Sequence, residues 1–394
     1  MRVTPLLMGL SLAVNVVQGQ SVERAAADVN TFASQVYKKM ADTAGNGNFV
    51  FSPLSLNIAL RMVEAGARGN TLAEMARVVN PSENATVASH SAQRLLRDLE
   101  SSDQCGFTAA NSVWVDRRCR VLPAFSDTLK LRFDAACQNV DFSRKAAVRR
   151  SCTTINNWVK KHTNGKITNL IDDKMVNSDT RMVLVNAIHF KCDWAHKFKK
   201  SNNFTGPFHS IDSTSKDVTF MSQTRAFDYI EETDYKAVSL PYSDNRFALL
   251  IVMPTGSFTD FESGLSGEFL TNMLSNMGEE RVALSLPKFK AGTSVDFTAT
   301  LRALGIVEAM STKADFSGIT GRKDLMLSKV VQKAMIEVEE SGTEAAAATA
   351  AAMMVKSAFI PKLIFFSVDH PFLYFIYDVQ NNVVIFAGRH TMAQ

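Results

Sequence analysis

Residues 337–361 read EVEESGTEAAAATAAAMMVKSAFIP, and this stretch decides how the whole chain is interpreted. A run of alanines, interrupted by Thr349, follows Gly342, and because alanine is the best helix former, propensity alone predicts a short helix or a linker. The run lies between two β-rich segments, however, and the bond Lys356-Ser357 behind it is one that a protease preferring basic residues would cut. Exposed stretches of low complexity are preferred sites of proteolysis. We therefore expect residues 340–361 to form an exposed, protease-sensitive loop.

The composition around this stretch is that of a soluble globular protein. The chain has 394 residues, of which 46% are apolar and 21% are charged, and its formal net charge is +4. This is enough apolar material for a large core, and the charge balance neither requires nor excludes a polyanionic partner. We expect no nucleic-acid partner.

The first 19 residues predict a secretory signal peptide. Arg2 is the lone charge, residues 5–17 are mostly apolar, and small residues allow cleavage after Gly19. The alternative, a membrane anchor, is disfavoured because the run falls short of the roughly 20 apolar residues that a bilayer requires. We therefore expect a secreted, extracellular chain of residues 20–394, glycosylated at the sequons of Asn84 and Asn203 where these lie on the surface.

The cysteines are odd in number, so at least one thiol is unpaired. They are Cys105, Cys119, Cys137, Cys152 and Cys192. No two of them form a C-x-x-C pair, so neither a zinc site nor a redox motif is expected. Two alternatives stay open, namely small buried thiols or one to two disulfide bridges.

Apolar periodicity separates a helical front of the chain from a β-rich middle and back. Helical spacing predicts helices at residues 25–41, 54–67, 84–99 and 151–162. Strand-like runs predict strands at residues 107–115, 182–191, 237–241, 247–254 and 281–290. A buried hairpin is expected from residues 372–379 and 383–388, which are apolar at nearly every position. This order favours an α+β fold.

Motifs of common enzymes are missing from the chain. It has no G-x-S-x-G elbow, no P-loop, no G-x-G-x-x-G after a strand and no H-E-x-x-H. The seven histidines are scattered singly, and the pair His189 and His196 lacks metal-ligand spacing. We expect no catalytic activity, no cofactor and no metal.

Basic residues cluster at two places. The clusters are Arg117, Arg118 and Arg120, and Arg144, Lys145, Arg149 and Arg150. Heparin or another glycosaminoglycan could bind there. An ordinary solvated face is the simpler explanation, and the sequence favours it.

Further motifs, taken with residues 337–361, resemble the serpin family over essentially the whole chain after residue 19. Residues 342–349 resemble the family's hinge. The others occur in the order expected for serpins: 48–55 (NFVFSPLS), 184–191 (LVNAIHFK) with Trp194, 240–242 (LPY), 286–289 (LPKF), 315–318 (DFSG) and 369–373 (DHPFL). The alanine-rich hinge and the basic residue of the bond Lys356-Ser357 also resemble those of secreted arthropod serpins, tick salivary ones in particular.

The resemblance implies a single domain over residues 20–394, with three β-sheets, eight or nine helices and an exposed reactive-centre loop at about 340–361. It also implies a suicide inhibitor of serine proteases rather than an enzyme. The target protease cuts the loop, forms an acyl-enzyme, and is trapped when the cleaved loop inserts into the main sheet as a new strand. The hinge that enters first would be Gly342, Thr343, Glu344, Ala345, Ala346, Ala347, Ala348 and Thr349.

The family's usual loop length, counted from Gly342, places the scissile bond between Lys356 and Ser357. A lysine there fits a protease pocket that holds a buried carboxylate, so the expected partners are trypsin, plasmin-like or coagulation proteases. A shifted frame that uses Met353 or Met354 would instead suit a chymotrypsin- or elastase-type protease. We expect the protein to be a monomer and to bind no membrane.

The resemblance further implies a polar shutter of Ser52, Ser55, Asn186 and Gln332 beneath the sheet, and a breach at Trp194. Gln332 stands where most serpins have a histidine, but a glutamine amide can also donate and accept hydrogen bonds. Two alternatives to an inhibitor stay open. One is a non-inhibitory serpin that acts as a carrier or chaperone, and the other is a glycosaminoglycan-regulated binding protein.

Overall fold

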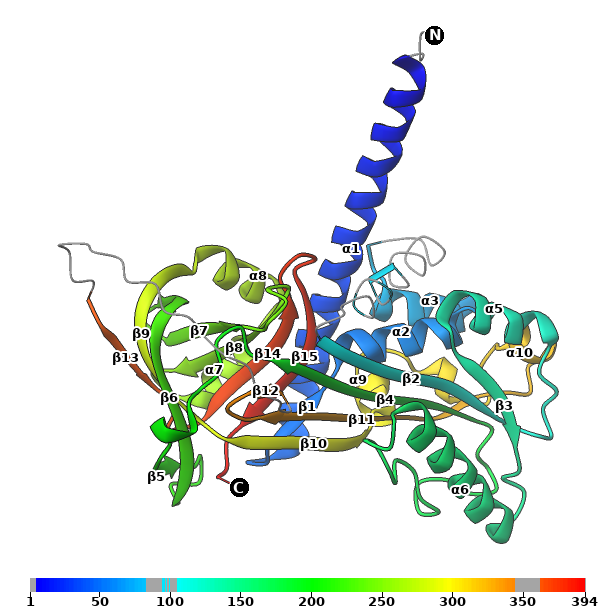
Figure 1. Ribbon diagram of the computed structural model, residues 1–394. Helices are drawn as coiled ribbons and strands as arrows, with labels where there is room; N and C mark the ends of the chain where they lie inside the picture. Colours follow the sequence, from blue (N-terminus) through cyan, green and yellow to red (C-terminus); the bar gives the residue numbers. More distant parts are fainter. Residues whose placement is uncertain are drawn as a thin grey trace.

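The computed structural model describes residues 5–82, 94, 95, 97, 99, 105–343 and 362–393, with the backbone alone for residues 5–21 and Thr343. The helices are α1 (Pro5–Ala44), α2 (Pro53–Glu64), α3 (Gly69–Val79), α5 (Pro123–Phe133), α6 (Lys145–His162), α7 (Phe258–Gly264), α8 (Gly267–Asn276), α9 (Thr298–Ala303) and α10 (Ser317–Thr320), with the 3-10 turns η1 (Lys200–Asn202) and η2 (Glu308–Met310). The first half of α1 projects away from the body (Figure 1). No helix within these ranges is long and apolar enough to span a bilayer.

The strands form two hydrogen-bonded sheets. They are β1 (Phe49–Phe51), β2 (Cys105–Asp116), β3 (Ala136–Val140), β4 (Met182–Asp193), β5 (Phe204–His209), β6 (Ser215–Glu231), β7 (Tyr235–Pro241), β8 (Phe247–Pro254), β9 (Gly278–Pro287), β10 (Phe289–Asp296), β11 (Leu327–Val338), β12 (Gly342–Thr343), β13 (Ile364–Ser367), β14 (Phe372–Asp378) and β15 (Val383–His390). The six-stranded sheet has the order β10-β11-β4-β2-β3, with β12 paired to β4. The nine-stranded sheet has the order β1-β15-β14-β8-β7-β6-β9-β13, with β5 paired to β6.

Strand β6 explains why the expected three sheets are seen as two. It has 17 residues and pairs with β5 and β9 over much of its length, and with β7 at its end. Two of the three sheets are therefore continuous through this one strand, while the six-stranded sheet is separate. The predicted α+β class is confirmed.

Strand β4 lies in the middle of the six-stranded sheet and is buried on both faces. Leu184, Ile188 and Phe190 belong to the main hydrophobic core, whereas Val183 and Val185 point to a second cluster beneath α6. This alternation is the period of two expected for a strand. Figure 1 shows α6 lying across the face of this sheet. The second cluster also contains Trp114, Ile155, Val159 and Val331.

Most of the predicted elements are confirmed, and β8 has the predicted bounds. Helix α6 is the clearest difference, because it begins at Lys145 and not at residue 151. Its cap residue Arg144 makes no capping hydrogen bond, and its first two turns carry Lys145, Arg149 and Arg150. Positive charges at a helix N-terminus oppose the helix dipole, so local rules give no start signal there. The helix predicted at 84–99 lies outside the described residues, apart from positions 94, 95, 97 and 99.

Candidate functional site

The junction between β11 and β4 is where a new strand would have to enter the six-stranded sheet. The two strands run parallel and pair directly, from Leu327 opposite Met182 to Met335 opposite His189. Beyond this paired region, β12 lies antiparallel to the end of β4, with Thr343 opposite Cys192. The sheet is therefore closed along most of its length, and the first two residues of the predicted hinge already occupy one end.

Gly342 forms the turn that reverses the chain from β11 into β12. Its amide donates to the Glu339 carbonyl at 3.2 Å, and the Glu339 amide donates back at 3.1 Å. Gly342 has a φ of 133°, and a Cβ atom at this position would lie 2.2 Å from the Cys192 carbonyl oxygen. Only glycine combines this backbone conformation with such a close approach. The glycine at the start of the hinge is therefore required by the turn itself.

The turn is held from outside by the segment that follows β4. The Trp194 amide donates to the Ser341 carbonyl at 2.9 Å, and the Trp194 indole Nε1 donates to the Glu339 carbonyl at 2.8 Å. The Phe198 amide donates to the Glu340 carbonyl at 2.8 Å. Trp194 is buried and stacks on Tyr242 with ring centroids 4.6 Å apart. Trp194 thus fixes the turn that leads from β11 into β12.

The side chain of Glu340 anchors the same turn to the neighbouring sheet. Its carboxylate accepts from Asn203 Nδ2 at 2.6 Å and forms an ion pair with Lys288 Nζ at 3.0 Å. Burial alone would raise the pKa of Glu340, but the hydrogen bonds from Asn203 and Lys288 lower that pKa to about 2. The carboxylate is therefore charged at neutral pH, and Glu340 has only 6% of its surface exposed.

The four predicted shutter residues meet in one hydrogen-bond network below the middle of the junction. Gln332 lies opposite Asn186 in the β11–β4 register and donates through Nε2 to its Oδ1 at 2.6 Å. Gln332 also accepts from the Ser52 amide at 2.8 Å and donates to the Ser52 carbonyl at 2.9 Å. Asn186 donates to Ser55 Oγ at 2.5 Å. The glutamine amide thus uses its donor and acceptor together.

One member of this network, Asn111, was missed from the sequence. It lies opposite Asn186 in the β2–β4 register and accepts a hydrogen bond from the Asn186 amide. Gln332, Asn186 and Asn111 therefore form a polar row across three adjacent strands, beneath the N-terminus of α2. Asn111 falls within an apolar strand pattern, and only the strand register places it next to Asn186.

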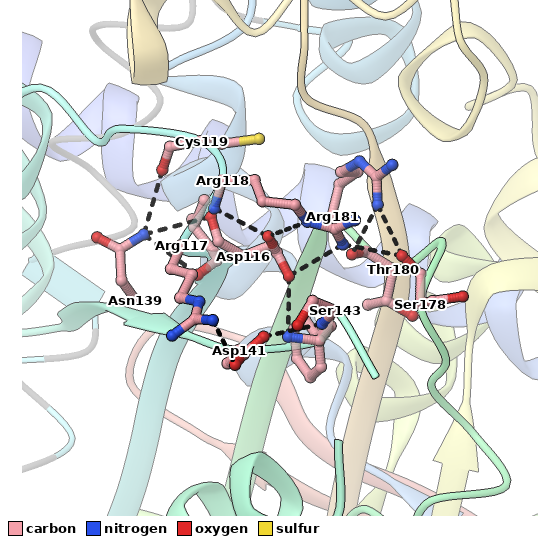
Figure 2. A network of polar contacts seen from close by, with 12 residues as sticks. Asp116, Arg117, Arg118, Cys119, Asn139, Asp141, Ser143, Ser178, Thr180 and Arg181 are labelled. Atoms are coloured by element: carbon pink, nitrogen blue, oxygen red, sulfur yellow. Dashed lines mark hydrogen bonds and ion pairs between the residues drawn. The ribbon is translucent and has the colours of Figure 1, made fainter. Parts of the chain in front are cut away.

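The predicted polyanion-binding residues are partly engaged in internal ion pairs (Figure 2). Arg118 forms a two-pronged contact with the buried carboxylate of Asp116, at 2.6 and 3.1 Å. Burial alone would raise the pKa of Asp116, but the hydrogen bonds from Arg118 lower it. Arg117 pairs with Asp141 at 2.9 Å, and Arg149 pairs with Asp173 at 2.7 Å. The remaining members are Arg120, Arg144, Lys145 and Arg150.

Much of the predicted loop lies outside the described residues. This holds for the reactive bond of Lys356 and Ser357 and for the hinge from Glu344 to Thr349. The sequon residue Asn84 also lies outside them, whereas Asn203 is half-buried, with its amide nitrogen donating to Glu340.

Known proteins resemble this chain over nearly its full length. The family model "Serpin (serine protease inhibitor)" matches residues 27–392. The chain belongs to the serpin family. It is 38% identical over 370 residues to Serpin B6 of Macaca fascicularis, and the aligned region covers 91% of this chain and 96% of the relative. It is 34% identical over 372 residues to the leukocyte elastase inhibitor of Xenopus tropicalis, with coverage of 91% and 97%.

A solved serpin structure supports the same assignment. The structure of Serpin48, described as a highly specific serpin in the insect Tenebrio molitor, matches with a TM-score of 0.82 and 32% identity. The match covers 95% of this chain and 99% of that one. Many serpins are inhibitors of serine proteases and some are not inhibitory, and the family is consistent with the expectation that the chain is not an enzyme.

The comparisons contradict the expectation of a secreted, extracellular protein. Serpin B6 and the leukocyte elastase inhibitor belong to a group of intracellular serpins that lack signal peptides. The extracellular location inferred from residues 1–19 is therefore wrong. The prediction of glycosylation at Asn84 and Asn203 depended on that location, so it no longer has support. The family match begins at residue 27 and does not test the cleavage predicted after Gly19.

Proposed function

We propose that this serpin is a monomeric suicide inhibitor of trypsin-like serine proteases, and that it traps them by inserting its cleaved loop between β11 and β4. The observation that carries the proposal is the antiparallel pairing of Gly342 and Thr343 with the end of β4. A strand that enters between two parallel strands can run antiparallel to both, and the chain already leaves the turn in that direction. Insertion would then extend a pairing that has begun.

The register at this end specifies where every later residue would lie. Thr343 is opposite Cys192, so each further residue of an antiparallel strand would pair with the preceding residue of β4. Side chains of opposite residues lie on the same face, and Cys192, Phe190, Ile188 and Leu184 all belong to the main core. The later loop residues that would face this core are Ala345, Ala347, Thr349 and Ala351, followed by Met353 opposite Met182.

The first four of these core-facing residues are all small. Protein interiors are close-packed, so a large side chain would need space that the core does not offer. An alanine also has no polar group to desolvate and no rotamers to restrict. The alanine run would therefore let insertion proceed faster than hydrolysis of the acyl-enzyme, which is the condition for trapping the protease.

The same register gives the distance over which the protease would be carried. Lys356 would lie opposite position 179, just beyond the start of β4 at Met182. Lys356 is thirteen positions beyond Thr343, and at 3.3 Å per residue this amounts to about 43 Å. In the covalent step, the protease serine oxygen bonds to the Lys356 carbonyl carbon, and the bond to Ser357 breaks as its nitrogen takes a proton. The trapped enzyme would then lie at the opposite end of the sheet.

We do not extend the proposal to a glycosaminoglycan. Arg117, Arg118 and Arg149 already pair with carboxylates of the chain, which reduces the positive charge that these two clusters present. Heparin binding stays a prediction of the sequence.

Incubation with trypsin tests the proposal. We expect a covalent complex that survives boiling in detergent, and a released C-terminal peptide whose first residue is Ser357 by mass spectrometry. A matched incubation of Lys356→Ala should give no complex with trypsin. A cleaved chain together with fully active, free trypsin would contradict the inhibitory mechanism, and a peptide starting elsewhere would contradict the assigned bond.

A further inference from the structure

Two cysteines and a carboxylate meet where the hinge enters the six-stranded sheet. Cys105 and Cys192 are directly opposite each other on β2 and β4, with Cα atoms 4.4 Å apart, and they are joined by a disulfide. The carboxylate is that of Asp244, from the turn between β7 and β8. The two sulfur atoms and a carboxylate oxygen all lie within 4.8 Å of one another. The cysteines are 87 residues apart in sequence, so no local spacing motif could have predicted this group.

We propose that these three residues bind a zinc ion when the disulfide is reduced. A dithiol reductant would supply two electrons and two protons, giving two cysteine thiols and the oxidised dithiol. One Zn²⁺ would then bind both sulfur atoms as thiolates and release two protons, while Asp244 supplies an oxygen. Two thiolates and a carboxylate, with water as the fourth ligand, suit the tetrahedral preference and the borderline-soft character of zinc.

The geometry requires little movement. Zinc–sulfur bonds of about 2.3 Å in a tetrahedron place two sulfur ligands about 3.8 Å apart. Directly opposite residues whose Cα atoms are 4.4 Å apart allow this separation through side-chain rotation. Both cysteines are at most 2% exposed, so the metal would be shielded from competing ligands in water.

The carboxylate is held in place by its own turn. Asp244 Oδ1 accepts from the Arg246 amide at 3.0 Å and from the Phe247 amide at 3.2 Å. This β7–β8 turn is itself fixed to β4, because the Ser243 amide donates to the Asp193 carbonyl at 2.8 Å. Hydrogen bonds that orient a ligand in this way raise metal affinity, since less freedom is lost on binding.

The other cysteines are poor competitors for the metal. Cys119, Cys137 and Cys152 are free thiols. Burial raises the pKa of Cys137 to about 12 and that of Cys152 to about 11, so both stay protonated at neutral pH. Among the residues that the structure describes, Cys105, Cys192 and Asp244 are the one group of three ligands close enough to share an ion.

The position of the site gives it a consequence for the hinge. Cys192 is the residue opposite Thr343, and Trp194, which stacks on Tyr242, holds the turn that leads into β12. A metal bound here would tie the end of β4 to the β7–β8 turn. Metal binding requires no protease, so a negative result in the test below would leave the inhibitory proposal untouched.

Cobalt binding to the full chain tests the site, since Co²⁺ reports thiolate ligands by its absorption and is displaced by zinc. A phosphine is the reductant of choice, because it reduces the disulfide with water as the oxygen source and adds no thiolates that would compete for the metal. We expect the reduced protein to bind one equivalent of Co²⁺ with a thiolate charge-transfer band that one equivalent of Zn²⁺ removes. The oxidised protein should show no such band.

Matched variants assign the ligands. Cys192→Ser should lose the band, Asp244→Asn should bind zinc at least about 10-fold more weakly, and Cys152→Ser should behave as the wild type. As a measurement on the wild type alone, Zn²⁺ should protect Cys105 and Cys192 of the reduced protein from alkylation. Absence of the band in reduced wild-type protein, its persistence in Cys192→Ser, or equal alkylation with and without Zn²⁺ would overturn the proposal.

Discussion

Thr349 interrupts the alanine run, and the strand registers give this interruption a specific role. The pair Thr343–Cys192, extended down β4, places Thr349 opposite Asn186. The bridge Glu339–Gly342, extended down β11, places it opposite Gln332. These two residues are each other's partners in the closed sheet, bonded at 2.6 Å. Insertion would separate them and put the Thr349 hydroxyl between them.

We therefore predict that Thr349→Val weakens the cleaved, inserted form and leaves the uncleaved form unchanged. A hydroxyl can both donate and accept, so it can replace the hydrogen bond that Asn186 and Gln332 lose when they separate. Valine has nearly the same shape but would leave a buried donor and acceptor without partners, at a cost of about 2 kcal/mol. Before cleavage we expect Thr349 to lie in the exposed loop, where this substitution changes little.

Denaturant unfolding of the two forms measures this effect. The loop is cut between Thr349 and Pro361 with a metalloprotease, which forms no acyl-enzyme and is not trapped. Guanidinium unfolding of the cut and uncut proteins is then compared for the wild type, Thr349→Val and the control Thr349→Ser. We expect a loss near 2 kcal/mol in cut Thr349→Val and a loss well below that in Thr349→Ser, which keeps the hydroxyl. An unchanged cut Thr349→Val, or an equal loss in its uncut form, would refute the register.

Three further predictions concern the entrance, the shutter and the hinge. Lys288→Met should cost about 2 kcal/mol of unfolding free energy at pH 6 by urea denaturation, because Glu340 loses its cation. The pKa of Glu340 in the folded protein is lowered to about 2 from 4.5, so this difference should shrink as the pH falls from 4.5 towards 2, and a difference independent of pH would contradict the assignment. Gln332→Leu should cost about 3 kcal/mol by the same assay, since it leaves Asn186 and Ser52 with buried unpaired groups, whereas Gln332→His should recover most of the loss. Ala347→Arg should turn the inhibitor into a substrate of trypsin, because insertion would bury an unpaired charge opposite Ile188, which costs at least about 3 kcal/mol and slows insertion roughly 100-fold. Undiminished covalent complex from this variant would argue against insertion.

The secondary structure was largely predictable because it depends on local patterns. The alternation of β4 and the continuous apolar run of β8 are visible in the sequence, since each reflects burial of one or both faces. The start of α6 was missed, because Arg144 provides no cap and the basic residues that follow oppose the helix dipole. Its position is set instead by the packing of Ile155 and Val159 on the sheet.

The candidate site was only partly predictable, because its contacts join distant parts of the chain. The motif resemblance led to Gln332 and Asn186, which are 146 residues apart. It did not lead to the contact between Glu340 and Asn203, separated by 137 residues. The disulfide partner of Cys105 was equally hidden, since the number of cysteines does not determine how they pair. Such pairs become visible only once the strand registers are known.

The register also explains why the closed sheet can persist although insertion would stabilise it. Opening the junction breaks one ladder, the pairing of β11 with β4, together with the Gln332–Asn186 bond beneath it. Insertion then forms two ladders, one on each side of the new strand. The loss comes first and the gain second, so a barrier separates two forms of which the second has more backbone hydrogen bonds. In the uncut chain both ends of the loop are held in sheets, at Thr343 by β4 and at Ile364 by β9. Only cleavage frees the segment that could then form the two ladders.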